Sequence, residues 1–66
     1  MKIIVNGEGR DVAEGFSLLE LFDQLELRPN MTVVERNGEI IDPAEFSAVH
    51  LEENDVLELI RFVGGG

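Results

Sequence analysis

The strongest signal for the fold of this chain lies in the segment FSLLELFDQL, residues 16–25. Ser17 followed by Glu20 forms the capping-box pattern, in which the two side chains satisfy backbone N–H groups at the start of a helix. Apolar side chains then recur at spacings of three and four residues, which places them on one helical face. They are Leu18, Leu21, Phe22 and Leu25. We therefore predict a helix that is capped by Ser17 and turns one apolar stripe toward the core.

The residues on either side of this segment predict how the helix is bounded. Phe16, before the cap, and Leu21 are placed to form a hydrophobic staple across the first turn. Pro29 disfavours helical geometry in the residue before it. The helix is therefore predicted to end at Arg28.

A hairpin is predicted before the helix. Residues 1–5 alternate, with Met1, Ile3 and Val5 on one parity, as in a half-buried strand. The segment Gly7-Glu8-Gly9 breaks this pattern, and Arg10–Ala13 resumes it as a short second strand.

A second hairpin is predicted after the helix. Met31–Arg36 reads as a strand, although adjacent Val33 and Val34 leave its buried parity open. Asn37-Gly38 then separates it from residues 39–41, and this pair favours the type I′ turn that joins antiparallel strands.

Three short segments complete the expected order of elements. Asp42 as a cap and Pro43 at the first position predict one helical turn that runs to Phe46. Residues 52–55 are expected to form a solvated turn, since they lack the alternating oxygen ligands and central glycine of a calcium loop. Residues 56–62 read as the last strand.

The parity of that last strand bears on function. Leu57 and Leu59 share one parity, and Glu58 marks the other as solvent-facing. Strict alternation then places Ile60 and Phe62 on the exposed face and Arg61 on the inner parity, beyond the edge of the core. Two exposed apolar residues beside the end of the chain suggest a docking surface. A twist or bulge that buries one of them is the alternative.

Composition limits the kinds of protein that the chain can be. Its 66 residues make one domain, which buries only ~60% of its unfolded surface and has no room for a large enclosed active site. A hydrophobic content of 44% and a mean hydropathy of +0.04 favour a packed globule. No apolar run approaches the ~20 residues of a membrane span. The first residues lack a signal-peptide core, so a cytoplasmic protein is expected, with no membrane partner.

Charge and reactive residues limit the chemistry. A net charge of −9 argues against nucleic acid and favours a positively charged protein partner, although solubility alone could also explain it. The absence of cysteine excludes disulfides, thiolate metal sites and persulfide carriage on this chain. His50 is isolated and is expected at the surface, and no metal site is predicted.

The chain finishes with Phe62-Val63-Gly64-Gly65-Gly66. Glycine contributes no side chain to packing and is costly to order. Three extended glycines reach roughly 10 Å and can thread a channel that rejects bulkier residues. The group that such a tail delivers is the α-carboxylate of Gly66. A frayed terminus or a leftover linker is the alternative.

The order strand, strand, helix, strand, strand, short turn, strand resembles the ubiquitin-like β-grasp fold, an α+β fold with a mixed sheet of four to five strands packed on one helix. Chain length, residues 37–41, the Glu-rich turn before Val56 and the terminal glycines are similar to the thiamine-biosynthesis sulfur carrier (ThiS) family. The resemblance divides the chain into a domain, residues 1–63, and a flexible tail, residues 64–66.

The resemblance also implies a function that needs no catalytic side chain and no bound cofactor. An E1-like adenylating enzyme would use ATP and Mg to activate the carboxylate of Gly66, with Gly65 beside it. Sulfur from a donor protein would then replace AMP to give a thiocarboxylate, and a thiazole synthase would take that sulfur for thiamine. Ile60, Phe62, Val63 and Gly64 are the expected partner-binding residues of a chain that is a monomer on its own.

Two alternatives remain open from the sequence. The small subunit of molybdopterin synthase shares the fold, tail and activation but passes its sulfur to a pterin. A non-covalent acidic β-grasp interaction domain, whose glycine tail is incidental, belongs to a different functional class.

Overall fold

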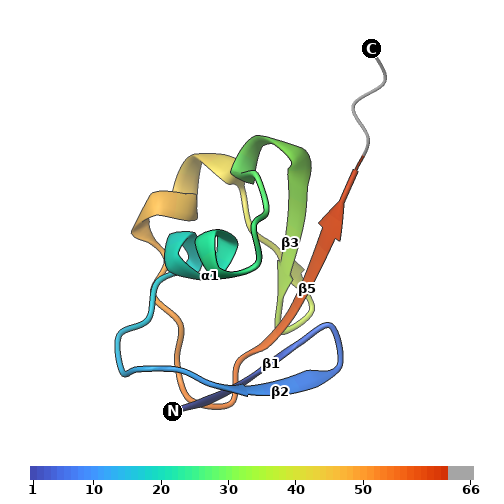
Figure 1. Ribbon diagram of the computed structural model, residues 1–66. Helices are drawn as coiled ribbons and strands as arrows, with labels where there is room; N and C mark the ends of the chain where they lie inside the picture. The colour runs from blue at the N-terminus through green and yellow to red at the C-terminus, as the bar shows by residue number, and fades with distance from the viewer. Residues whose placement is uncertain (63–66) are drawn as a thin grey trace.

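The computed structural model describes residues 1–62, in which a five-stranded mixed sheet carries α1 and two 3-10 helices on one face (Figure 1). The elements are β1 (Lys2–Val5), β2 (Glu8–Asp11), α1 (Leu18–Gln24), η1 (Pro29–Met31), β3 (Thr32–Arg36), β4 (Glu39–Ile40), η2 (Pro43–Ala48) and β5 (Val56–Arg61). The strand order is β2-β1-β5-β3-β4, so the last strand of the chain lies in the middle of the sheet. This is the predicted ubiquitin-like β-grasp fold.

The register of β5 sets which side chains face the core. β5 pairs parallel with β1 and antiparallel with β3, where Val34 lies opposite Leu59 and Val33 opposite Ile60. Because side chains alternate along a strand, one face of the sheet is continuously apolar and packs against the stripe of α1. The buried cluster contains Ile3, Val5, Val34, Leu57 and Leu59 from the strands and Leu18, Leu21 and Phe22 from the helix. Val34, not Val33, is therefore the inward residue that the sequence left open.

The start of α1 agrees with the prediction. The Ser17 hydroxyl accepts a hydrogen bond from the backbone N–H of Glu20 at 3.1 Å, and the Glu20 carboxylate accepts one from the backbone N–H of Ser17 at 3.0 Å. Phe16 and Leu21, the two residues of the predicted staple, are both buried in the core.

The end of α1 corrects the prediction that Pro29 stops the helix. The helix ends at Gln24, and Glu26 adopts a left-handed conformation with φ of 56°. The backbone N–H of Leu27 donates to the carbonyl of Phe22 at 2.8 Å, and that of Glu26 donates to the carbonyl of Asp23. These two bonds make a Schellman motif with glutamate at the position where glycine is usual, so no glycine marks this end of the helix. Pro29 instead begins η1.

Both hairpins form, but the first one turns earlier than predicted. Asn37-Gly38 has positive φ at both residues, 51° and 86°, as a type I′ turn requires. Asn6-Gly7 repeats this geometry with φ of 50° and 83°, and β2 already begins at Glu8. The turn therefore lies at Asn6-Gly7 and not at residues 7–9 as predicted, because this Asn-Gly pair supplies the two positive φ angles of a type I′ turn.

The helical turn predicted after Asp42 is present and longer than expected. The Asp42 carboxylate accepts a hydrogen bond from the backbone N–H of Ala44 at 3.0 Å, and Pro43 occupies the first position of η2. η2 continues through Ala48 and buries Phe46, whose ring lies 5.3 Å from that of Phe22 between centroids. This contact joins η2 to α1 over the sheet.

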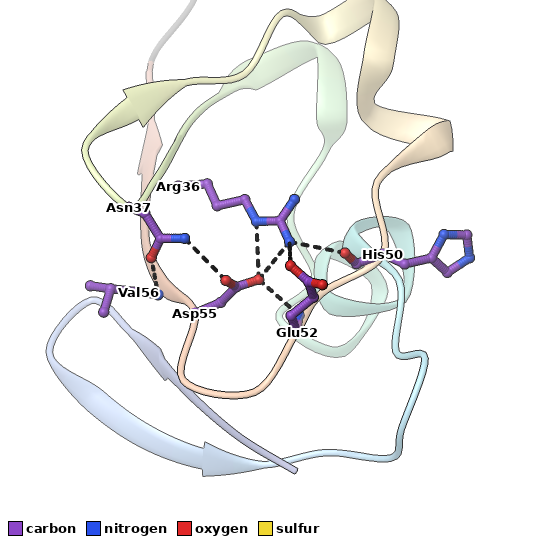
Figure 2. A network of polar contacts seen from close by, with 6 residues as sticks. All are labelled: Arg36, Asn37, His50, Glu52, Asp55 and Val56. Atoms are coloured by element: carbon purple, nitrogen blue, oxygen red, sulfur yellow. Dashed lines mark hydrogen bonds and ion pairs between the residues drawn. The ribbon is translucent and has the colours of Figure 1, made fainter.

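The loop before β5 corrects one part of another prediction. Glu52, Glu53 and Asn54 are exposed, as expected of a solvated turn, but Asp55 is only 5% exposed. Figure 2 shows how its carboxylate joins the loop to the second hairpin. Arg36 pairs with Asp55 at 2.8 Å, Asn37 Nδ2 donates to it at 3.1 Å, and the backbone N–H of Glu52 donates to it at 2.8 Å. Burial opposes ionisation, but the bonds from Glu52, Asn37 and Arg36 together hold the pKa of Asp55 below its ordinary value.

The same network fixes where β5 begins. The side-chain oxygen of Asn37 accepts a hydrogen bond from the backbone N–H of Val56 at 2.9 Å, while its own backbone N–H donates to the carbonyl of Val56 at 2.8 Å (Figure 2). Because β5 leads directly to the end of the chain, this anchoring sets the register of the strand that carries the tail.

Candidate functional site at the base of the tail

The candidate site lies where β5 ends. Arg61 is the last residue of the strand, and the backbone N–H of Phe62 still donates to the carbonyl of Met31 at 3.0 Å. β1 pairs with the start of β5, whereas the β3 side holds the chain in the sheet up to Phe62. This end of β5 lies far from the N-terminus (Figure 1). The predicted site residues Val63, Gly64, Gly65 and Gly66 lie outside the described residues, as does the predicted boundary between domain and tail.

The predicted exposure of Ile60 and Phe62 is confirmed. Their exposed fractions are 55% and 43%, so the alternative in which a twist or bulge buries one of them is wrong. Their role in binding a partner stays a prediction. Arg61 is also exposed, as predicted for a residue on the inner parity that lies beyond the edge of the core.

Register adds two residues that sequence reasoning missed. Val33 lies directly opposite Ile60 on β3, and Ile40 lies on β4 opposite Glu35, two residues along the same face. Both are exposed. We call Val33, Ile40, Ile60 and Phe62 the outer apolar patch. No local pattern in the sequence could join its members, because their adjacency depends on how three strands pair.

A hollow of about 370 Å³ opens beside this patch. Its lining is almost entirely apolar and includes Val33, Ile40, Ile41, Pro43, Phe46 and Phe62. Desolvating such a surface against a partner is favourable at about 25 cal/mol per Å². The base of the tail therefore carries a surface suited to an apolar side chain of another protein.

A second hollow, of about 360 Å³, lies beside the end of β5 and has a different chemistry. Its lining residues are Glu26, Arg28, Met31 and Arg61. Arg61 and Ile60 are consecutive in β5 and point to opposite faces of the sheet. The described chain therefore ends, at Phe62, between an apolar surface on one side and a pair of arginines on the other.

Within residues 1–62 no group of three or more His, Asp or Glu side chains is placed to hold a metal ion. His50 is exposed, and its ring points away from the network around Asp55 (Figure 2). None of the helices in this part of the chain is long and apolar enough to cross a membrane.

Comparison with solved structures defines the class of protein. The crystal structure of the thiamine biosynthesis protein ThiS from Geobacter metallireducens superposes with a TM-score of 0.83 at 33% identity, and the match covers 100% of both chains. Its solution structure matches with a TM-score of 0.78. Together with the sheet order, this makes the chain a ubiquitin-like β-grasp domain.

Sequence comparison then gives the family. The ThiS family model matches residues 3–66. The sulfur carrier protein ThiS of Bacillus subtilis is 38% identical over 50 residues, which is 76% of each chain. The thiazole synthase of Paramagnetospirillum magneticum is 33% identical over all 66 residues, although these make up only 20% of that longer protein. The chain belongs to the ThiS family.

Proposed function

We propose that this chain is a sulfur carrier of thiamine biosynthesis that holds sulfur on its C-terminal carboxylate. In this role Gly66 is first adenylated by an E1-like enzyme and is then converted to a thiocarboxylate. The observation that carries the proposal is the family match, which runs through the terminal glycines to residue 66. The ThiS proteins of B. subtilis and G. metallireducens support the same assignment by their names.

The proposed chemistry needs activation, because a carboxylate is a poor electrophile. The Gly66 carboxylate attacks the α-phosphorus of ATP and releases pyrophosphate, with Mg held by the partner enzyme. Hydrosulfide delivered by a donor protein then attacks the acyl carbon of the resulting adenylate, and the C–S bond forms as the C–O bond to AMP breaks. In this mechanism every catalytic group belongs to the partners, and the sulfur is carried on the terminal carboxylate because the chain contains no cysteine.

Similarity to thiazole synthases supports thiazole, and not a pterin, as the destination of the sulfur. Two proteins named thiazole synthase, from P. magneticum and Magnetococcus marinus, match the whole of this chain at 33% and 38% identity. The chain spans about a fifth of their length. A segment like this chain thus occurs within the same polypeptide as the rest of those synthases, which favours a thiazole synthase as the partner.

The geometry at the end of β5 supports tail delivery. A hydrogen-bonded strand holds the chain up to Phe62, and the outer apolar patch lies on one side of this point. A partner that binds this patch would receive the glycines in a defined direction, and three residues without Cβ atoms fit a narrow channel. Ile60, Phe62, Val63 and Gly64 are the residues that we expect the adenylating enzyme to contact.

A transfer assay tests this function. The chain is incubated with the adenylating enzyme, ATP, Mg and a donor loaded with radiolabelled sulfur, and is then repurified and mixed with thiazole synthase and its other substrates. Label should first appear on the chain and then in the thiazole product. The matched control is the same chain without Gly66, which should acquire no label. Label that reaches a pterin acceptor with molybdopterin synthase, but never thiazole, would contradict the proposed acceptor.

A further inference from the structure

The two arginines beside the tail stand apart from the other charged groups of this acidic chain. The remaining arginines have partners, because Arg36 is paired with Asp55 at 2.8 Å and Arg10 donates to Gln24 at 3.2 Å. Within residues 1–62 the side chains of Arg28 and Arg61 form neither an ion pair nor a hydrogen bond, although acidic residues outnumber basic ones fourteen to five.

The fold brings these two arginines together from distant parts of the sequence. Arg28 lies in the segment between α1 and η1, and Arg61 ends β5. The pairing of Arg61 with Thr32, and the bond from Phe62 to Met31, place the end of β5 against η1. Both arginines consequently line the same hollow of about 360 Å³, in which Glu26 is the one acidic residue.

Two arginines that line one hollow favour an anion there. Guanidinium presents a planar fork of donors that matches a carboxylate with two parallel hydrogen bonds. The single carboxylate of Glu26 leaves one positive charge in excess at this place. The hollow is therefore a cationic notch in a molecule whose net charge is −9.

We propose that Arg28 and Arg61 form a docking site for a carboxylate side chain of the adenylating enzyme, at the mouth of the channel that receives the tail. The inference rests on the proposed function and adds to it the chemistry of the partner's surface. The partner would be basic where it meets most of this acidic chain and acidic where it meets the notch.

The length of the tail favours a protein carboxylate, and not the nucleotide, as the group that occupies the notch. An extended chain advances roughly 3.3–3.6 Å per residue, so the five steps from Arg61 to Gly66 cover about 17 Å when the tail is threaded. The nucleotide reacts with the carboxylate at the far end of that span. The arginines remain at the base of the tail, where they can meet only the protein surface around the channel.

This arrangement would orient the carrier on its partner. A uniformly acidic carrier on a uniformly basic enzyme could dock in several rotations that differ little in energy. A cationic notch beside the tail penalises every rotation that brings it against basic groups, because like charges in an interface are costly. The tail would then enter the channel in one direction.

Two variants of equal charge test the inference. Arg61→Glu and Arg10→Glu each add two negative charges and give a net charge of −11. Arg10 lies on the edge strand β2, which β1 separates from β5 and which lies far from the end of β5 (Figure 1). The dissociation constant with the purified adenylating enzyme is measured at low salt, and circular dichroism melting confirms that both variants fold.

The outcomes separate the explanations. We expect Arg61→Glu to weaken binding by about tenfold or more, since an attractive charge-assisted pair becomes a repulsive one, while Arg10→Glu leaves binding unchanged or slightly tighter. Arg28→Glu should behave like Arg61→Glu. If all three variants bind equally well or more tightly than the wild-type chain, the partner is uniformly basic and the inference is wrong. Binding of inorganic phosphate to the notch, with enzyme affinity unchanged in Arg61→Glu, would make it a small-anion site and would also overturn the proposal.

Failure of the proposed function would look different. A wild-type chain that binds the enzyme but never gains sulfur would refute the carrier function, whereas the comparison of the charge variants would still report on the notch. Conversely, a wild-type chain that gains sulfur while Arg61→Glu and Arg10→Glu bind alike would refute the notch alone.

Discussion

Removal of the Asp55 carboxylate should destabilise the domain far more than its position in a short loop suggests. The side chain is buried and accepts hydrogen bonds from Arg36 Nε at 3.0 Å, from Asn37 and from the backbone N–H of Glu52. In Asp55→Ala all three groups lose this acceptor. Arg36 is left with the carbonyl of His50 at 3.1 Å and with Glu52 at 3.6 Å.

The size of the expected destabilisation follows from the burial of the ion pair between Arg36 and Asp55. Breaking a buried ion pair by removing one partner costs about 3–5 kcal/mol. The side chain of Arg36 is 24% exposed and keeps one backbone acceptor, so part of its charge stays solvated. We therefore expect Asp55→Ala to lower the free energy of unfolding by about 2–4 kcal/mol. A domain of this size has about 3–10 kcal/mol in total. The melting temperature should fall by roughly 8–32 °C, at about 4–8 °C per kcal/mol.

Urea unfolding followed by far-ultraviolet circular dichroism measures this loss directly. Glu52→Ala is the matched control, because it removes the other carboxylate that faces Arg36 but one that is 82% exposed. A surface pair of this kind contributes about 0–1 kcal/mol. If Asp55→Ala destabilises the chain no more than Glu52→Ala does, the buried network is not what anchors the loop.

The same side chain predicts a pH dependence. The pKa of Asp55 is held below its ordinary value in the folded state, so its contribution to stability is present above the unfolded pKa and is lost as the pH falls through the folded pKa. Asp55→Asn keeps the shape but not the charge. The free energy of unfolding of this variant should vary less with pH than that of the wild-type chain over this acidic range. If both proteins lose stability equally as the pH falls, other carboxylates cause the loss.

Three further predictions concern the proposed carrier function. Ile60→Asp should weaken binding to the adenylating enzyme at least about tenfold while the melting temperature barely moves. The control Leu59→Asp, on the buried face, should unfold the domain, and unfolding of Ile60→Asp as well would place Ile60 in the core. Gly65→Val should change the free energy of unfolding by less than about 0.5 kcal/mol but block adenylation, because a branched side chain would not fit a narrow channel. Adenylation is measured as pyrophosphate release, and an unaltered rate would refute the idea that the tail threads such a channel. The association rate constant with the adenylating enzyme should fall steeply with added salt while the dissociation rate constant changes less. An association rate constant that does not depend on salt concentration would mean that the charge of −9 serves solubility alone.

The parts of the fold that the sequence predicted are those whose causes are local. The capping box at Ser17 and the turn at Asn37-Gly38 depend on neighbours within four residues, and the structure reproduces both. The parity of β5 was also readable, since Leu57 and Leu59 alternate with a charged residue. Asn6-Gly7 carries the same turn signal as Asn37-Gly38, so the position of the first turn was also predictable from local sequence.

The remaining features depend on contacts between distant segments. Asp55 is buried because Arg36 and Asn37, almost twenty residues earlier, supply its hydrogen bonds, and nothing in the loop itself reveals this. The left-handed Glu26 occupies a position where a glycine would have signalled the end of the helix. The outer apolar patch and the cationic notch exist only once the register of β3 with β5 is known.

The central claim is that Gly66 carries the sulfur, and intact mass spectrometry tests it most directly. The chain is incubated with the cognate adenylating enzyme, ATP, Mg and a sulfur donor, and its mass is compared with that of a sample lacking ATP. We predict a gain equal to the replacement of one oxygen by one sulfur, confined to the C-terminal peptide after proteolysis. An unchanged mass, with an enzyme shown to be active on another carrier, or a gain located in any other peptide, would contradict the account.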